Sequence, residues 1–373
     1  MAATGKTRPG PNARPLEYKE NWPQVRERML AFWEHEIIDR ACIAVTAPRE
    51  SQVPVPEADA EREIADIGFH FERYHALLRN TYYGGEALPV ASTVLGMAAY
   101  GGTPRFMKDA KDFYGTIWID PIISDWQSTP YRFDAQGKWC QRFLELKRRE
   151  SLDCRGRYLP SADGCLPPTD NLMQLRGPGP LCLDMLVHPG EVEAALRELL
   201  TAFKWIQRQI LESMHAEEQG IVALRLWAPA TYHALCCDFS CMVSPELYRK
   251  FILPEMEELT NWVDYSFYHL DGPNALQHVP ALLELPKLRG IQWQPGAASA
   301  RIPALHWVPL FRRIQGAGKC VQMHAKYEEV EGLLEALDPR GVLIVTTAPS
   351  VEAADALLRN AEKWSCRKVH PVP

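Results

Sequence analysis

Strand-like and helix-like segments alternate steadily from Leu181 to the C-terminus, and this alternation restricts the fold more than any other feature of the chain. An amphipathic helix is predicted over residues 187–220, and an apolar strand over 221–229 follows it. The next helix begins at Ser244-Pro245, a typical helix start. Parallel strands in one sheet need a crossover connection, usually a helix, between them. The pattern therefore predicts an α/β fold built on a parallel sheet.

A barrel explains these segments better than an open sheet. The chain has no GxGxxG or GxxxxGK[ST] loop for nucleotide phosphates. Candidate functional residues are instead spread over many strand ends, as a barrel permits. We predict a (β/α)8 TIM barrel with an N-terminal helical elaboration, which has helices over residues 22–38 and 60–78. Residues 1–16, rich in Pro, Gly and Arg, are expected to be a disordered lead, and residues 17–373 a single barrel domain.

Composition and charge argue against several classes of protein. The 373 residues have a formal net charge of -6 and no basic patch, so neither nucleic acid nor an anionic membrane surface is an expected partner. No run is long and apolar enough for a membrane span, and the N-terminal residues lack the apolar core of a signal peptide. The 10 cysteines contain no CxxC pair, which fits reduced thiols and a cytoplasmic location.

Residues 263–296 place polar side chains at the ends of two strands. The strand VDYSFYHL stops at Asp271-Gly272-Pro273, a turn signal that leaves His269 and Asp271 at its carboxyl end. Ligands of parallel α/β folds collect at this end, so the two residues are catalytic and metal-binding candidates. A structural role is the alternative. His269 could be a core histidine bonded to a backbone carbonyl, and Asp271 could cap the loop in an Asx turn.

Aromatic and polar residues at other strand ends are candidates for substrate binding. Trp227 and Trp293 lie at predicted strand ends, where aromatic walls could stack on a sugar ring or enclose a methylated ammonium group. Each tryptophan could equally be a core residue. Asp238 precedes a helix, so its default position is in the loop before that helix. The substrate-binding candidates are Trp118, Trp227, Tyr268, Trp293, Gln294 and His324.

Four stretches resemble the uroporphyrinogen decarboxylase-like superfamily, which includes corrinoid and coenzyme M methyltransferases. They are LMQLRGPGPLCLDMLVHPGEVEAAL (172–196), CDFSCMVSPELYRKFILPEMEEL (237–259), YHLDG (268–272) and GVLIVTTAPSVEAADALL (341–358). The resemblance implies a (β/α)8 barrel with its site in the mouth. It also implies that the DFS-like segment lies near this site, which adds Asp238 to the catalytic candidates His269 and Asp271.

The chain departs from that superfamily at informative positions. It has nothing like the arginine-rich MRQAGRY segment of true uroporphyrinogen decarboxylases, which argues against porphyrinogen decarboxylation. The His-x-Cys motif of the zinc methyltransferases reads His269-Leu270-Asp271 here, and the distant Cys expected around Thr346–Ala348 is absent. A carboxylate and a hydroxyl in place of two thiolates harden the site, so a thiol such as coenzyme M is disfavoured as an acceptor.

Methyl transfer is the activity that the resemblance implies. His269 and Asp271 would bind a divalent metal such as zinc, with a third ligand from Cys320, His324 or another strand end, or would protonate the leaving group. The aromatic wall would orient a small methylated compound. The corrinoid would be carried by a separate partner protein, because this chain has no DxHxxG cobalamin motif.

Two other functions fit the same residues. A lyase or decarboxylase acting on a small carboxylate or sugar acid would use them as proton donor and orienting partner. Arg225 and Arg176 could then pair with the carboxylate, although both could instead form structural ion pairs. The third alternative is a non-catalytic barrel that binds a small molecule. A homodimer is compatible with all three.

Overall fold

The computed structural model describes residues 14–91, 93, 95–106, 117–296, 299 and 301–369. The predicted disordered lead, residues 1–16, lies mostly outside the described residues. Its last residue, Leu16, exchanges two backbone hydrogen bonds with Lys19, at 3.1 and 3.0 Å. The extent of a single domain over residues 17–373 stays a prediction.

A seven-stranded sheet lies at the centre of the molecule, with strand order β2-β1-β11-β10-β9-β8-β7. Its neighbouring strands are parallel except for β2, which pairs antiparallel with β1. The strands of this sheet are β1 (Cys42–Pro48), β2 (Thr81–Gly85), β7 (Tyr232–Cys236), β8 (Tyr265–Asp271), β9 (Gly290–Gln294), β10 (Cys320–His324) and β11 (Val342–Thr347). Two separate pairs are β3 (Pro104–Phe106) with β4 (Ile117–Ile119), and β5 (Ile221–Ala223) with β6 (Leu226–Ala228).

The inner strands are buried along almost their whole length. β10 and β11 read CVQMH and VLIVTT, and every residue except the last of each is buried. Parallel strands covered on both faces have this continuous apolar character. The last residues, His324 and Thr347, are exposed, so polar groups emerge at the carboxyl ends. The strand predicted before Asp271 is confirmed as β8.

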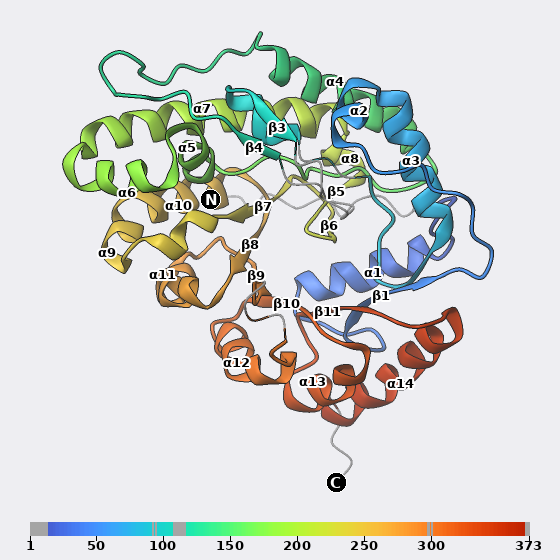
Figure 1. Ribbon diagram of the computed structural model, residues 1–373. Helices are drawn as coiled ribbons and strands as arrows, with labels where there is room; N and C mark the ends of the chain where they lie inside the picture. The colour runs from blue at the N-terminus through green and yellow to red at the C-terminus, as the bar shows by residue number, and fades with distance from the viewer. Residues whose placement is uncertain are drawn as a thin grey trace, which may run out of the picture.

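Most of the helices lie around the outside of the strands (Figure 1). In that view α12, α13 and α14 are on one side of the molecule, and α6, α7 and α10 are on the other. A proline stands in the first turn of many of them, where its missing N–H leaves no hydrogen bond unmade. The helices are α1 (Trp22–Trp33), α2 (Ala60–Ala65), α3 (Ile67–Asn80), α4 (Lys138–Asp153), α5 (Pro168–Arg176), α6 (Pro178–Val187), α7 (Pro189–Ser213), α8 (Ala216–Gln219), α9 (Pro245–Leu247), α10 (Leu253–Trp262), α11 (Val279–Glu284), α12 (Val308–Gly316), α13 (Val330–Ala336) and α14 (Val351–Val369).

Irregular segments continue the backbone hydrogen bonding beyond β1. The N–H of Glu86 donates to Ile43 of β1 at 2.9 Å, and the N–H of Leu159 donates to Pro89 at 3.2 Å. Val222 of β5 then donates to Pro160 at 2.9 Å. The structure confirms the predicted α/β class with a mostly parallel central sheet. None of the described helices combines the length and apolar character that a membrane span needs.

The region predicted as one helix over residues 187–220 contains α7 and α8, and its first residue is the last of α6. α6 ends at Val187, α7 begins at Pro189, and α8 follows after His215. Pro189 cannot donate a hydrogen bond to α6 and instead occupies the start of α7. His215 adopts a left-handed conformation, with φ of 51°, which interrupts the helix. The prediction of one continuous helix is therefore wrong, although Gly220 ends α8 as expected.

The region predicted as one strand over residues 221–229 is a β-hairpin. β5 and β6 pair antiparallel, with Ala223 opposite Leu226. Leu224 and Arg225 form the turn, and both have a positive φ, 49° and 60°. Two-residue hairpin turns of the I′ type need positive φ at both positions and usually contain Asn or Gly. Neither residue type marks this turn in the sequence, so the prediction of a single strand is wrong.

Candidate active site

The carboxyl ends of β7, β8 and β9 bring the first site residues together. Cys236 of β7 is in register with His269 of β8, and Asp271 of β8 is in register with Gln294 of β9. His269 and Asp271 are two residues apart, so their side chains leave the same face of β8. Neighbouring strand ends therefore place these polar groups side by side.

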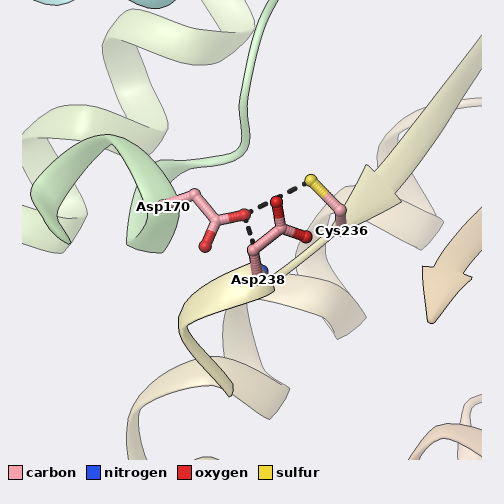
Figure 2. Close-up of side chains that lie close together, drawn as sticks. All are labelled: Asp170, Cys236 and Asp238. Atoms are coloured by element: carbon pink, nitrogen blue, oxygen red, sulfur yellow. Dashed lines mark hydrogen bonds between the residues drawn. The ribbon is translucent and has the colours of Figure 1, made fainter. Parts of the chain in front are cut away.

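Asp170 holds the turn that follows β7 (Figure 2). It belongs to the first turn of α5, and its side chain is directed at a 3-10 turn, Asp238–Met242. Its carboxylate accepts the backbone N–H groups of Asp238 and Phe239 at 2.9 and 3.0 Å, and the thiol of Cys236 at 3.3 Å. Asp170 is only 1% exposed. Because these donors occupy its oxygens, its main effect is to fix the position of Asp238.

Asp238, His269 and Asp271 form a compact cluster. The potential ligand atoms of these three residues all lie within 4.8 Å of one another. Asp170 and Cys236 form a second group of the same dimensions with Asp238, which is shared between the two. Asp238, in the turn after β7, therefore lies close to His269 and Asp271 at the end of β8.

Burial and mutual repulsion act on the carboxylates of this cluster. Asp238 is exposed, yet the surrounding protein displaces much of the water around its carboxylate, which raises its pKa to about 6. The charge of Asp170 adds to this rise and His269 opposes it. Burial also raises the pKa of Asp271, where His269 opposes the rise and Asp238 adds to it. The cluster therefore has excess negative charge that a proton or a cation would offset.

A hydrogen bond to Gln292 orients the imidazole of His269. Nδ1 of His269 lies 2.5 Å from Oε1 of Gln292, and Gln292 is 4% exposed on β9. An amide oxygen only accepts, so this contact assigns the proton to Nδ1 and leaves the lone pair on Nε2. Such a contact fixes the tautomer of a metal-binding histidine.

The three residues fit a divalent cation. One imidazole nitrogen and two carboxylate oxygens are ligands that zinc and similar ions accept. Oδ1 of Asp271 is buried and has no hydrogen-bond partner among the described residues. Cys236 does not join this donor set, because burial and the neighbouring carboxylates Asp170 and Asp238 raise its pKa well above the ordinary thiol value. It stays a protonated donor to Asp170.

A cavity of about 870 Å³ opens beside the cluster. Asp271 borders it through Gly296, since a Cβ atom placed on that lining residue would lie 3.5 Å from Oδ1 of Asp271. Trp293 and Trp307 line one part of the cavity, with ring centroids 4.8 Å apart and ring planes at 60°. A cavity of this size with an aromatic wall and a few polar groups is typical of small-molecule sites.

His324 is near enough to both Arg225 and His269 for their charges to act on it. It lines the cavity at the end of β10, and the structure also places Gln294 and Arg225 in the cavity wall. His324 is accessible to solvent at the mouth, but surrounding protein lowers its pKa to about 4, and the charges of Arg225 and His269 lower it further. The structure thus brings together six of the predicted site residues: Asp238, His269, Asp271, Trp293, Gln294 and His324.

Three predicted substrate-binding residues lie elsewhere. Trp227 is 1% exposed and packs edge-on against Trp22, because the hairpin turns it into a small separate cluster. Tyr268 is also 1% exposed, since it leaves the face of β8 opposite to His269. Trp118 is 49% exposed on β4 and does not line the cavity. None of the three lines this cavity, and their contact with a substrate stays a prediction.

Several residues of the site were not predicted from the sequence. Asp170 contacts Asp238, which is more than 60 residues away in the sequence, so no local sequence pattern indicates its role. Gln292, Trp307 and Thr346 reach the site because their strands or helices are neighbours in space. The alternation of β9 offered a weak signal, since Gln292 and Gln294 are polar residues two positions apart in an apolar strand.

Comparison with solved structures shows that this fold is shared with a methyltransferase from Methanosarcina mazei. The two structures superpose with a TM-score of 0.58 and 12% sequence identity, over 91% of this chain and 98% of that chain. No protein-family profile matches the chain. A search of curated proteins also gave no match.

Proposed function

We propose that the chain is a methyltransferase that takes a methyl group from a small compound and passes it to a corrinoid on a separate protein. The fold shared with a methyltransferase supports the proposal. The observation that carries it is the cluster of Asp238, His269 and Asp271 beside a cavity of about 870 Å³. We also propose that the sheet closes into a (β/α)8 barrel through the irregular segments between β1 and β5, which continue its hydrogen bonding.

Demethylation leaves negative charge or a basic lone pair on the atom that loses the methyl group. The bond between the methyl carbon and its heteroatom breaks, and the bonding pair stays on the heteroatom. The methyl group would pass to the corrinoid of the partner protein, which would supply the electron pair of the new carbon–cobalt bond. The released alkoxide or amine must then be compensated by a proton or a Lewis acid. The demethylating site therefore needs such a group beside the heteroatom.

Asp238, His269 and Asp271 would meet this need by holding a divalent cation. When bound, the cation would act as a Lewis acid on the heteroatom. Gln292 keeps the lone pair of His269 on Nε2, available to the cation. Asp170 keeps Asp238 beside the other two ligands through the N–H groups of the turn. The chain's own residues thus prepare the site, and Trp293 in the adjoining wall would orient the substrate.

Two measurements on the purified protein test this proposal. Elemental analysis, after growth with zinc, iron and cobalt and without chelator, should find one divalent ion per chain. His269→Ala and Asp271→Ala should lose it, and His188→Ala should keep it, because His188 lies at an exposed helix junction. Free cob(I)alamin with methylated amines, ethers and acids should then give methylcobalamin, read by its absorbance. Absence of metal in the wild type, or full turnover in both site variants, would refute the proposal.

A lyase or decarboxylase is the second candidate. Arg225 and His324 line the same cavity, and a guanidinium there suits a carboxylate substrate. This activity would release carbon dioxide or an eliminated fragment without any corrinoid. Product analysis by mass spectrometry of the same reactions separates it from methyl transfer, since only methyl transfer consumes cob(I)alamin.

A further inference from the structure

The turn between β5 and β6 is strained at two consecutive residues. Leu224 and Arg225 have φ of 49° and 60°, a region that residues with a Cβ atom rarely adopt. Such a conformation carries a steric cost for a residue with a Cβ atom, and strain of this kind concentrates at functional sites. A hairpin of this kind is ordinarily made with Asn-Gly, which would avoid the strain. The presence of Leu224 and Arg225 at these positions therefore indicates that the turn has a functional role.

Long-range hydrogen bonds impose this conformation. The N–H of Leu224 donates to Oδ1 of Asp163 at 3.2 Å, and the carbonyl of Leu224 accepts Nε2 of Gln322 at 2.9 Å. The hydroxyl of Tyr232 donates to the carbonyl of Ala223 at 3.1 Å, just before the turn. Gln322 and Tyr232 are both fully buried. The turn is thus fixed from three sides.

The fixed turn places Arg225 in the wall of the cavity. Its side chain is exposed, and its charge acts on His324, which lines the same cavity. Arg225 also acts electrostatically on Asp163, so a structural ion pair is the alternative role for its charge. A purely structural pair would not require a side chain that lines a cavity and stays accessible.

Two buried hydrogen-bond donors of residues that line the cavity have no partner among the described residues. Oγ1 of Thr346 and Nε1 of Trp293 are buried, and neither has a partner among the described residues. Both residues line the cavity, and they are only 5% and 1% exposed. A buried donor without a partner is costly unless a ligand satisfies it. A guanidinium and two such donors in the wall of one cavity form a set suited to an anionic oxygen ligand.

We infer that the substrate is a small acid, whose carboxylate binds Arg225 while its methylated heteroatom faces His269 and Asp271. The placement of the methylated end of the substrate rests on the proposed function, whereas the binding of its carboxylate does not. Trp293 and Trp307 would hold the part of the molecule between the two ends.

The charges around the cavity favour a single negative charge on the ligand. Glu328 and Glu329 line the rim beside Lys326, and Oε2 of Glu329 accepts the N–H of Lys326 at 3.0 Å. These carboxylates, with Asp271 nearby, would repel a phosphate dianion more strongly than a carboxylate. A planar carboxylate also matches the fork of Arg225, so it is the anion to test first.

Binding of matched compounds tests the inference without a methyl-transfer assay. The probes are glycine betaine against choline, and 4-methoxybenzoate against 4-methoxybenzyl alcohol, each pair differing in the carboxylate. Saturation-transfer NMR and calorimetry on the metal-loaded wild type should detect at least one acid and neither carboxylate-free analogue. Arg225→Gln should weaken acid binding by about tenfold or more, because it removes a charged hydrogen-bond donor. Arg249→Gln, in an exposed ion pair with Glu284, should leave it unchanged.

Several outcomes would overturn the inference. They are failure of both acids to bind at millimolar concentration, equal binding of the carboxylate-free analogues, and unchanged affinity in Arg225→Gln. The experiments distinguish failure of this inference from failure of the proposed function. Acid binding that depends on Arg225 without consumption of cob(I)alamin would refute methyl transfer alone. Turnover of a methylated compound with no acidic group, unaffected by Arg225→Gln, would refute this inference alone.

Discussion

Nδ1 of His269 and Oε1 of Gln292 lie 2.5 Å apart across β8 and β9, at positions that are in register in the sheet. The strand pairing therefore determines which imidazole nitrogen can bind a cation. Gln292 has no other evident reason to be polar, because the strand around it is buried and apolar. Substitution of Gln292 therefore tests whether the neighbouring strand orients His269.

Gln292→Leu should reduce metal retention without removing a ligand. The variant frees Nδ1 of His269, so that the imidazole can rotate or adopt the other tautomer. Loss of such a supporting contact typically lowers metal affinity by about 10–100-fold. Competition with a chelator, followed by elemental analysis, measures the change. Gln315→Leu is the control, since Gln315 bonds only exposed backbone carbonyls of a distant loop. Equal retention in the two variants would contradict this role for Gln292.

Asp170→Asn should weaken both the fold and the site. The aspartate accepts two backbone N–H groups and a thiol, and an asparagine cannot accept at both of its side-chain atoms. We expect a loss of about 1–3 kcal/mol in the free energy of unfolding, measured by denaturant titration, together with lower metal affinity. Asp264→Asn is the matched control, because Asp264 is exposed and its carboxylate accepts the hydroxyl of Thr231. A stability equal to that of the control would show that Asp170 does not hold the turn.

The sequence was sufficient for the class of fold and for part of the site. Alternation of strands and helices is a local property, and it predicted the parallel sheet. His269 and Asp271 could be found because a turn signal directly follows their strand. Trp293, Gln294 and His324 were found by the same reasoning at later strand ends.

The remaining errors have physical causes in long-range contacts. The turn at Leu224 and Arg225 lacks Asn or Gly, and its conformation is imposed by Asp163 and Gln322 from distant segments. No local pattern could have shown it. The missed turn also displaced the expected position of Trp227, which the hairpin directs into a separate cluster. A polar side chain such as Asp170 can be buried only when it has hydrogen-bond partners, and these partners come from segments that the fold brings together.

Glu255→Gln should change how stability depends on pH. Burial raises the pKa of Glu255 to about 8, the nearby charge of Asp170 adds to the rise, and hydrogen bonds from Thr169 oppose it. The folded pKa lies above the unfolded value of 4.5, so the stabilising contribution is complete below pH 4.5 and is lost as the pH rises toward 8.

Glutamine cannot ionise, so Glu255→Gln should gain stability relative to the wild type as the pH rises from about 5.5 to about 8. The limit for one group is about 1.4 kcal/mol per pH unit. Thermal melting of both proteins across this range measures the difference. Glu258→Gln, which removes an exposed carboxylate, should show no such trend. A constant difference between Glu255→Gln and the wild type at all pH values would contradict the assigned cause.

Arg225→Gly should keep or raise the stability of the protein while it removes acid binding. Glycine adopts positive φ without steric cost, so the variant relieves roughly 1 kcal/mol of strain at φ of 60°. For a chain of 373 residues, such a gain corresponds to a rise of only about 1 °C in Tm. Leu224→Asn is the companion variant, because asparagine tolerates the left-handed region and Arg225 is retained. We expect Leu224→Asn to keep its affinity for the acid and Arg225→Gly to lose it. A fall of several degrees in the Tm of Arg225→Gly would instead assign Arg225 to the structural ion pair with Asp163.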